Sequence, residues 1–195
     1  AVKNFIGLMK EGYAGDLTPE QKEYVDFAYE SNEQQLELID GFLKLARSDS
    51  GKSSLNKKIV NLGVLIKSVI DQQLGTLAER NQQCKLLSPD QSTDIMADED
   101  YLRMAIENLV SNASKYTKPG GKITVSIEVY EKDMIITVKD SGVGIDQADI
   151  KRLFVKFSRI PNELSQSVGG SGIGLYLTKH VVDLHKGKIE VKSTL

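Results

Sequence analysis

The chain has 195 residues, which is long enough for one domain of ordinary size with a smaller attachment, and its 40% hydrophobic and 27% charged residues are typical of a folded protein. Because 25 basic and 27 acidic side chains leave a net charge of −2, nucleic acid and anionic membrane surfaces are not expected as partners. No secretory signal or membrane-spanning run is recognisable, and the single cysteine, Cys84, cannot form an internal disulfide, so a reducing cytoplasmic setting is expected.

The first quarter of the chain predicts two helices. Residues 1–12 are largely apolar and have no cap before them, which indicates the end of a helix whose beginning is missing. A break at GYAGD follows. Thr18, Pro19 and Gln21 then supply an N-cap, a first-turn proline and a capping box, so a long helix is predicted over about 19–47.

The helix predicted over 19–47 carries a heptad seam. Its positions, alternately three and four residues apart, are Val25, Ala28, Asn32, Gln35, Ile39, Phe42 and Ala46. Further apolar positions that widen this face are Tyr24, Phe27, Leu36, Leu38 and Leu43. A stripe this broad needs more cover than the short helix before it, so we expect a homodimer through a helical bundle. The alternative is an interaction helix that docks on the chain's own second domain.

A polar linker over 48–54 places the domain boundary. Beyond it, apolar residues three and four positions apart predict helices over 62–80 and 99–116. Cys84 is expected in a strand between these helices.

Two strands are predicted from strict alternation, over 123–129 and 134–138, and the short EKD turn indicates a hairpin. One-sided alternation means that helices should cover one face of this sheet. A helix over 172–185 and a strand near 188–192 complete an α+β, two-layer sandwich over 55–195.

One polar helix face lies in the segment ENLVSNASKY. Asn108, Asn112 and Lys115 are four and three residues apart and therefore share this face. Amide oxygens and an ammonium group suit a hydrated Mg²⁺ ion and phosphate oxygens. Taken alone, the same spacing also fits an ordinary solvated face.

The segment DSGVGI, residues 140–145, directly follows a predicted strand. A carboxylate at a strand end, here Asp140, can accept a hydrogen bond from an exocyclic amine such as that of adenine. The glycines at 142 and 144 allow the backbone to approach a flat ring closely. A turn with this sequence is also common without any ligand.

Two further segments contain features that suit phosphate. LFVKFSR, residues 153–159, interleaves aromatic and basic side chains, although a plain amphipathic helix would look similar. GGSGIGL, residues 169–175, leads into a helix, and a glycine-rich turn before a helix N-terminus is a ready anion site. Neither a dinucleotide-type motif nor a P-loop lysine is present.

In this order and spacing, the four segments resemble the asparagine box, first glycine box, phenylalanine box and second glycine box of the Bergerat (GHKL) ATPase fold, in the form found in sensor histidine kinases. The long upstream helix, the SGK linker and Asp98 ahead of the asparagine helix also resemble that family, so the resemblance covers nearly the whole chain.

The resemblance implies ATP and Mg²⁺ as cofactors and assigns the site residues. Asn112 is expected to ligate Mg²⁺, with Asn108 one turn earlier beside the phosphates. Asp140 is expected to bind the adenine amine, residues 146–170 to form a lid over ATP, and Arg159 to reach the γ-phosphate. The other residues expected to line the nucleotide are Lys115, Tyr116, Gly142, Gly144, Ile145, Gly170, Gly172, Ile173, Gly174 and Leu175.

One position separates kinases from the hydrolytic ATPases of the same fold. Gyrase-like and MutL-like enzymes carry a glutamate general base one turn before the magnesium asparagine, where this chain has Asn108. An amide cannot take a proton from water at neutral pH. Glu107 lies about 100° away around the helix and should not substitute for it.

The resemblance also indicates what this chain lacks. AVKNFIGLM resembles the residues that follow the family's acceptor-histidine box, which implies that the acceptor lies upstream of Ala1. The only histidines here, His180 and His185, lie in the helix after the second glycine box and are expected to be structural or exposed. The family also continues past KIEVKSTL into another strand, so the catalytic domain is expected to be truncated before its last strand and to leave a sheet edge.

Together, these features and the resemblance imply the catalytic core of a sensor histidine kinase in two-component signal transduction. Residues 1–47 are expected to be part of a dimerisation and phosphotransfer hairpin without its acceptor, and 55–195 the ATP-binding domain. The phosphate would pass from ATP to a histidine and then to an aspartate of a response regulator. The alternatives are a serine kinase of the anti-sigma type and a dimeric nucleotide-binding scaffold without transfer. The domain is expected in the cytoplasm, and an upstream membrane anchor in the parent protein stays open.

Overall fold

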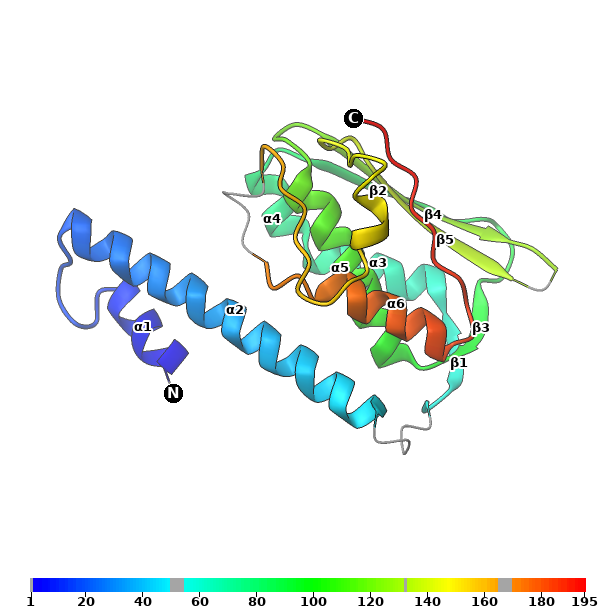
Figure 1. Ribbon diagram of the computed structural model, residues 1–195, viewed down its shortest axis with the longest axis horizontal. Coiled ribbons are helices and arrows are strands. Elements are labelled where there is room, and N and C mark those ends of the chain that lie inside the picture. Colours follow the sequence, from blue (N-terminus) through cyan, green and yellow to red (C-terminus); the bar gives the residue numbers. More distant parts are fainter. Residues whose placement is uncertain (1, 50–54, 132, 165–169) are drawn as a thin grey trace. The chain divides into compact units, whose positions relative to one another are not determined.

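The computed structural model describes residues 2–49, 55–131, 133–164 and 170–195 (Figure 1). The chain forms two compact units, one of Ala1–Ser53 with Gly169–Ser171 and the other of Ser54–Val168 with Gly172–Leu195. In the described part of the chain, no helix is at once long enough and apolar enough to span a bilayer.

The first unit contains two helices, α1 (Val2–Lys10) and α2 (Pro19–Asp49). The predicted capping box at the start of α2 is confirmed. The Gln21 N–H donates to Thr18 Oγ1 at 3.2 Å, and the Thr18 N–H donates to Gln21 Oε1 at 2.9 Å. These two bonds satisfy backbone donors that the first turn of a helix leaves without partners.

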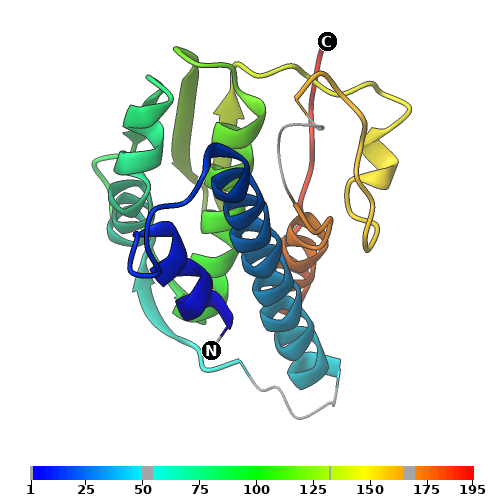
Figure 2. The ribbon, with the colours of Figure 1, turned by 90° about the vertical axis from the view of Figure 1, so that its left-hand side faces the viewer.

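Helix α1 packs against α2 (Figures 1 and 2). Lys10 Nζ lies 2.8 Å from Asp26 Oδ1 and 5.3 Å from the centre of the Tyr29 ring. Gly7 also faces this ring, since a Cβ there would meet Tyr29 at 3.9 Å. The contact covers little apolar surface, because Val25 is the only buried residue among the described side chains of α1 and α2.

Most of the described positions on the apolar face predicted for α2 are therefore exposed. Along the seam, Ala28, Gln35 and Ile39 are exposed and Asn32 is half-buried. The side chains of Leu38, Phe42, Leu43 and Ala46 lie outside the described residues. The large apolar side chains exposed in this unit are Val2, Phe5, Leu8, Met9, Tyr13, Tyr24, Phe27, Leu36 and Ile39.

The second unit is built on a three-stranded sheet with the strand order β2-β4-β5. Its strands are β2 (Gln83–Leu87), β4 (Lys122–Val129) and β5 (Met134–Asp140). Strands β4 and β5 pair antiparallel, with Val125 opposite Val138, which confirms the predicted hairpin. Strand β2 pairs parallel to β4 and contains Cys84, as expected.

A second, smaller sheet was not predicted. Strands β1 (Lys58–Asn61) and β3 (Asp94–Ala97) pair antiparallel, and their buried residues are Val60 and Ala97. Each strand has four residues, which is too short for alternation to be distinctive.

The α-helices in the described part of this unit are α3 (Leu62–Gln72), α4 (Leu74–Glu79), α5 (Glu99–Tyr116) and α6 (Gly174–Leu184). Asn61 and Asp98 cap α3 and α5 through side-chain oxygens that accept the N–H groups of Val64 and Tyr101. The helices expected over 99–116 and 172–185 are confirmed.

The single helix predicted over 62–80 is wrong, because the chain breaks at Gln73. The Gln73 side chain there donates to the Glu107 carbonyl at 3.3 Å, and Gly75, near the start of α4, has a low helix propensity.

The hydrophobic core lies between α3, α5 and one face of the sheet. Ile66 and Val69 of α3, Val110 of α5 and Val125 of β4 are fully buried. Burial of each such side chain stabilises the fold by about 1.5–3 kcal/mol. On β4, Ile123, Val125 and Ile127 are buried and alternate with more exposed residues, so the predicted one-sided sandwich is confirmed.

The strand predicted near 188–192 is wrong. This stretch forms no strand, and the last residues bind the loop after β5 instead. Ser193 Oγ accepts the Ile145 N–H at 2.9 Å, and the Ser193 carbonyl accepts from Gln147 Nε2 at 2.7 Å. Ladder pairing would need the backbone of 188–192 to face a strand edge, and β5 bonds only to β4 in the described sheet.

Candidate nucleotide-binding site

The polar face of α5 is joined to α6 through the side chain of Asn108. Asn108 Nδ2 donates to Thr178 Oγ1 at 2.8 Å, and Asn112 Nδ2 donates to Asn108 Oδ1 at 3.4 Å. The two asparagines therefore form a hydrogen-bonded pair one helical turn apart, as their spacing predicted. Figure 1 shows α5 and α6 side by side in this unit.

The N-terminal end of α6 lies against this pair. A side chain on Gly174 would overlap Asn108 Oδ1, so only glycine allows the helix start to come this close. Ile173 precedes the helix and is buried, and no side chain caps the first turn. The N–H groups of the first helical turn and the helix dipole favour an anion at this end.

The C-terminal end of α5 meets the first glycine segment. The Val143 N–H donates to the Tyr116 carbonyl at 3.2 Å, and a side chain on Gly142 would overlap the same carbonyl. Buried Gln82 fixes this end of the helix, because its Nε2 donates to the carbonyls of Ser114 and Thr117 at 2.9 and 2.8 Å. Lys115 and Tyr116, both half-buried, are thereby held beside residues 140–145.

Asp140 is the last residue of β5, and one of its two carboxylate oxygens accepts a hydrogen bond. The Gly142 N–H donates to Asp140 Oδ1 at 2.8 Å, which orients the carboxylate, and among the described residues no hydrogen bond uses Oδ2. Gly144 has a φ of +73° and packs against the Thr194 carbonyl, so the turn needs glycine there. Ile145 follows and is held by its bond to Ser193.

The phenylalanine segment contacts the second glycine segment. The Phe157 N–H donates to the Gly172 carbonyl at 3.0 Å, and Gly172 has a φ of +68°. Lys156 Nζ lies 4.7 Å from the centre of the Tyr176 ring on α6, within range of a cation–π attraction. Arg159 is exposed on the same segment. A single short 3₁₀ turn, Ile150–Arg152, precedes these residues.

The second unit thus brings together most of the predicted site residues. The residues of this set that lie on α5, the β5 turn and the start of α6 are Asn108, Asn112, Lys115, Tyr116, Asp140, Gly142, Gly144, Ile145, Gly172, Ile173, Gly174 and Leu175. Gly170 belongs to the other compact unit, and residues 165–169 of the expected lid lie outside the described residues.

Thr178 was not predicted as a site residue. It is 1% exposed and sits between Asn108 and the start of α6. From sequence alone, a β-branched residue on the buried face of a helix is assigned to the hydrophobic core. Only the contact between α5 and α6 distinguishes Thr178 from such a core residue.

The two histidines lie on or next to α6. His185 Nδ1 lies 2.8 Å from the Val181 carbonyl, and His185 Nε2 accepts the Asp98 N–H at 3.1 Å. Since both ring nitrogens are engaged within the protein, the expectation of a structural role fits His185. His180 is half-buried.

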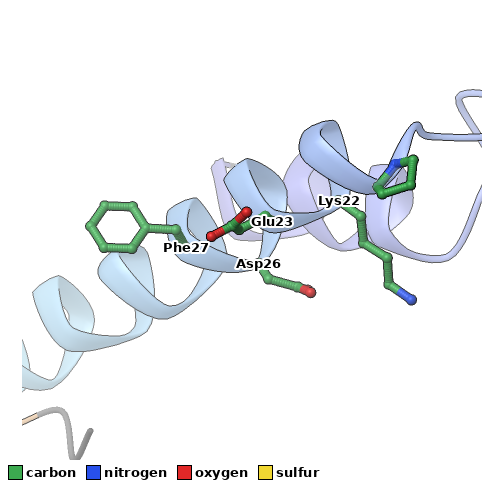
Figure 3. Close-up of a pocket in the computed structure, with 5 residues that line it drawn as sticks. Lys22, Glu23, Asp26 and Phe27 are labelled. Atoms are coloured by element: carbon green, nitrogen blue, oxygen red, sulfur yellow. The ribbon is translucent and has the colours of Figure 1, made fainter.

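A shallow hollow in the first unit is separate from these residues. Figure 3 shows its lining, which comes from the start of α2: Pro19, Lys22, Glu23, Asp26 and Phe27. Phe27 is 73% exposed there. A hollow lined by one helix has no opposing wall to enclose a small molecule, so it is not part of the candidate site.

Comparison with known proteins places the second unit in a family. The model of the histidine kinase-, DNA gyrase B- and HSP90-like ATPases matches residues 97–195. The circadian input-output histidine kinase CikA of Synechococcus elongatus is 33% identical over 183 residues, which is 93% of this chain and 24% of that protein. The sensor histidine kinase WalK of Bacillus subtilis is 31% identical over 159 residues, 80% of this chain and 26% of that protein.

Solved structures show the same fold. Full-length ShkA, solved in complex with AMPPNP, superposes with a TM-score of 0.70 at 23% identity. The matched region is 94% of this chain and 38% of the ShkA chain. The Acinetobacter baumannii histidine kinase AdeS gives a TM-score of 0.66 at 18% identity, over 94% of this chain and 82% of that one. The expected α+β Bergerat fold is confirmed.

The chain spans about a quarter of the length of these curated relatives. Their names favour neither the serine-kinase nor the scaffold alternative. On the matching family model, the fold and these relatives, the chain belongs to the histidine kinase-, DNA gyrase B- and HSP90-like ATPases, in the branch of the sensor histidine kinases.

Proposed function

We propose that this chain is the catalytic portion of a sensor histidine kinase, which holds Mg-ATP on its second unit and passes the γ-phosphate to a histidine outside these 195 residues. Residues 1–47 would belong to the dimerisation hairpin, 48–54 to a linker, and 55–195 to the ATP-binding domain. The phosphate would then move to an aspartate of a response regulator. The domain would work in the cytoplasm.

One observation carries this proposal. Asn108 stands where hydrolytic ATPases of the fold have a glutamate, and its amide nitrogen is engaged by Thr178 at 2.8 Å. An amide neither accepts a proton from water at neutral pH nor gains that ability from this bond. A site that binds ATP without activating water suits transfer to a protein side chain, for which positioning and charge neutralisation supply most of the catalysis.

The residues on α5 and α6 fit Mg²⁺ and phosphate. The Asn112 carboxamide points its nitrogen at Asn108, so its oxygen is the atom turned away from that pair, and Mg²⁺ prefers oxygen ligands. Asn112 would ligate the metal, Lys115 and Arg159 would offer cations, and the first N–H groups of α6 would bind phosphate oxygens. Bound Mg²⁺ would neutralise phosphate charge during transfer.

The turn after β5 fits the adenine base. Asp140 Oδ1 is held by the Gly142 N–H, so Oδ2 would accept from the exocyclic amine. Gly142 and Gly144 would allow the backbone to lie close to the ring, and Tyr116, joined to this turn through its carbonyl, would line the same side.

Neither histidine of the chain fits the acceptor. A phosphorylated imidazole needs a nitrogen that can attack the γ-phosphate, and both nitrogens of His185 are engaged within the fold. His180 lies on α6, whose own N-terminus would hold the phosphates, so it cannot reach them from that helix.

The first unit would form the dimer. Val2, Phe5, Phe27 and Ile39 are 55–73% exposed, and an exposed apolar face of this extent indicates a missing partner. A second copy would cover it in a helical bundle, with Asn32 and Gln35 near the middle setting the register.

Binding of nucleotide tests the proposal directly. Isothermal titration of the chain with ADP in MgCl₂ should give saturable binding, and Asn112→Ala should weaken it. Ser126→Ala, which removes a half-buried hydroxyl on the face of the sheet opposite the buried core, should leave the affinity unchanged. No heat and no thermal shift at millimolar ADP would contradict the proposal.

A further inference from the structure

Thr178 is a buried polar residue that no predicted box contains. It lies one turn into α6, and its single hydroxyl proton is donated to the Gly174 carbonyl at 3.1 Å. The oxygen of the same hydroxyl accepts from Asn108 Nδ2 at 2.8 Å. With 1% of its surface exposed, Thr178 has no access to water that could replace either bond.

These two bonds determine which way the Asn108 carboxamide faces. Because the hydroxyl proton is used by Gly174, the Thr178 oxygen can only accept, so Asn108 must present its nitrogen. Asn108 Oδ1 then faces Asn112. The tight packing of Gly174 against Asn108 Oδ1 holds the group between α5 and α6.

The orientation passes on to Asn112. An acceptor at Asn108 Oδ1 attracts the Asn112 nitrogen, and the two are 3.4 Å apart. The oxygen and the nitrogen of a carboxamide point in different directions from its carbon. Because the Asn112 nitrogen points at Asn108, Asn112 Oδ1 is directed away from Asn108 and can bind a cation there. If the Asn108 amide turned over, its nitrogen would face Asn112, and Asn112 would be favoured to present its own nitrogen to the cation.

We propose that Thr178 is a positioning residue that sets, through Asn108, the orientation of the Asn112 carboxamide and thereby the magnesium dependence of nucleotide binding. The inference rests on the proposed function, because it assumes that Asn112 ligates Mg²⁺. Thr178 itself touches neither metal nor nucleotide in this account. Groups that orient metal ligands in this way typically contribute about 10- to 100-fold to metal affinity.

The matched pair Thr178→Ser and Thr178→Ala isolates the hydroxyl, since both remove the same methyl group and only the alanine lacks the oxygen. Thr178→Val adds a variant that keeps the volume of threonine without the hydroxyl. The measurement is the dissociation constant of ADP by titration calorimetry, in MgCl₂ and in EDTA. The ratio of the two constants is the magnesium enhancement.

The alanine and valine variants should lose about 10- to 100-fold of the magnesium enhancement, with the affinity in EDTA unchanged, whereas the serine variant should retain it. In an Asn112→Ala background, Thr178→Ala should cause no further loss of enhancement. If the valine variant does not fold, the serine and alanine pair decides the matter alone.

An equal magnesium enhancement in the serine and alanine variants would overturn the role of Thr178. An equal loss of ADP affinity by the alanine variant with and without magnesium would overturn it as well, because such a loss indicates a structural effect only. Failure of the proposed function looks different. Unchanged protein that binds no ADP would overturn the nucleotide site, and unchanged protein whose ADP affinity ignores magnesium would overturn the metal site and this inference with it.

Discussion

His185 Nε2 accepts the backbone N–H of Asp98 at 3.1 Å, and this bond joins the end of α6 to the residue that caps α5. The Asp98 carboxylate also accepts the N–H groups of Tyr101 and Asn56, at 3.3 and 2.9 Å. Asp98 therefore joins three segments at one point: the start of α5, the end of α6 and the residues that lead into the second unit.

His185→Ala should destabilise the second unit. The substitution leaves the N–H of buried Asp98 without an acceptor and removes a ring that hydrogen-bonds to both Asp98 and the Val181 carbonyl, which together should cost roughly 1–3 kcal/mol. Urea unfolding followed by circular dichroism measures the loss. His185→Gln can still accept from Asp98 and should lose less. Equal stability of the alanine variant and the original chain would contradict the role given to this bond.

Asp140→Asn should weaken ADP binding by about 10- to 150-fold, because a hydrogen bond to a charged acceptor that a bound base shields from water contributes about 1.5–3 kcal/mol. The preference for ADP over GDP should fall as well. Asp71→Asn is a control with the same change of charge, since Asp71 is exposed on α3 and lies outside the proposed site. Equal effects of the two substitutions would remove Asp140 from the adenine site.

Local patterns predicted most of the fold. The reciprocal bonds of Thr18 and Gln21 follow from four consecutive residues, and the burial of Ile123, Val125 and Ile127 follows from alternation along one strand. The four segments in order indicated the family, and the structure brings Asn108, Asn112 and Gly174 together on two packed helices.

The features that sequence did not predict depend on contacts between distant residues. Val60 pairs with Ile95 in strands too short to show a period, and the break at Gln73 depends on its bond to Glu107. A strand was predicted near 188–192, but the position of Ser193 against Ile145 decides the course of this stretch. Thr178 acts through Asn108, 70 positions earlier.

Ile39→Glu should shift the chain from dimer toward monomer in analytical ultracentrifugation. Ile39 lies on the predicted seam of α2 and is 55% exposed, so a charge there would be desolvated on association. Ile59→Glu is a control of the same chemistry, since Ile59 is 73% exposed on β1 in the other unit. A similar loss of dimer for both variants, or none for Ile39→Glu, would contradict a dimer through the helical hairpin.

The thiol of Cys84 should react slowly. Burial in β2 raises the pKa of Cys84, so at a mildly alkaline pH the folded protein holds less thiolate than an exposed cysteine. Alkylation by iodoacetamide should accelerate on unfolding in urea. Because the folded-state pKa is the higher one, this thiol's contribution to stability is present below the unfolded pKa and declines as the pH rises toward the folded one. Equal alkylation rates in folded and unfolded protein would contradict this.

Phosphotransfer from ATP labelled with radioactive phosphorus at the γ position tests the central claim most directly. The chain is incubated with labelled ATP, MgCl₂ and a separate helical-hairpin protein that carries an acceptor histidine. Label should appear on the added hairpin alone, be lost in acid and survive base, and be absent with Asn112→Ala, because Mg²⁺ would no longer be held on α5. Label on His180 or His185 of this chain, or label that survives acid, would contradict the account.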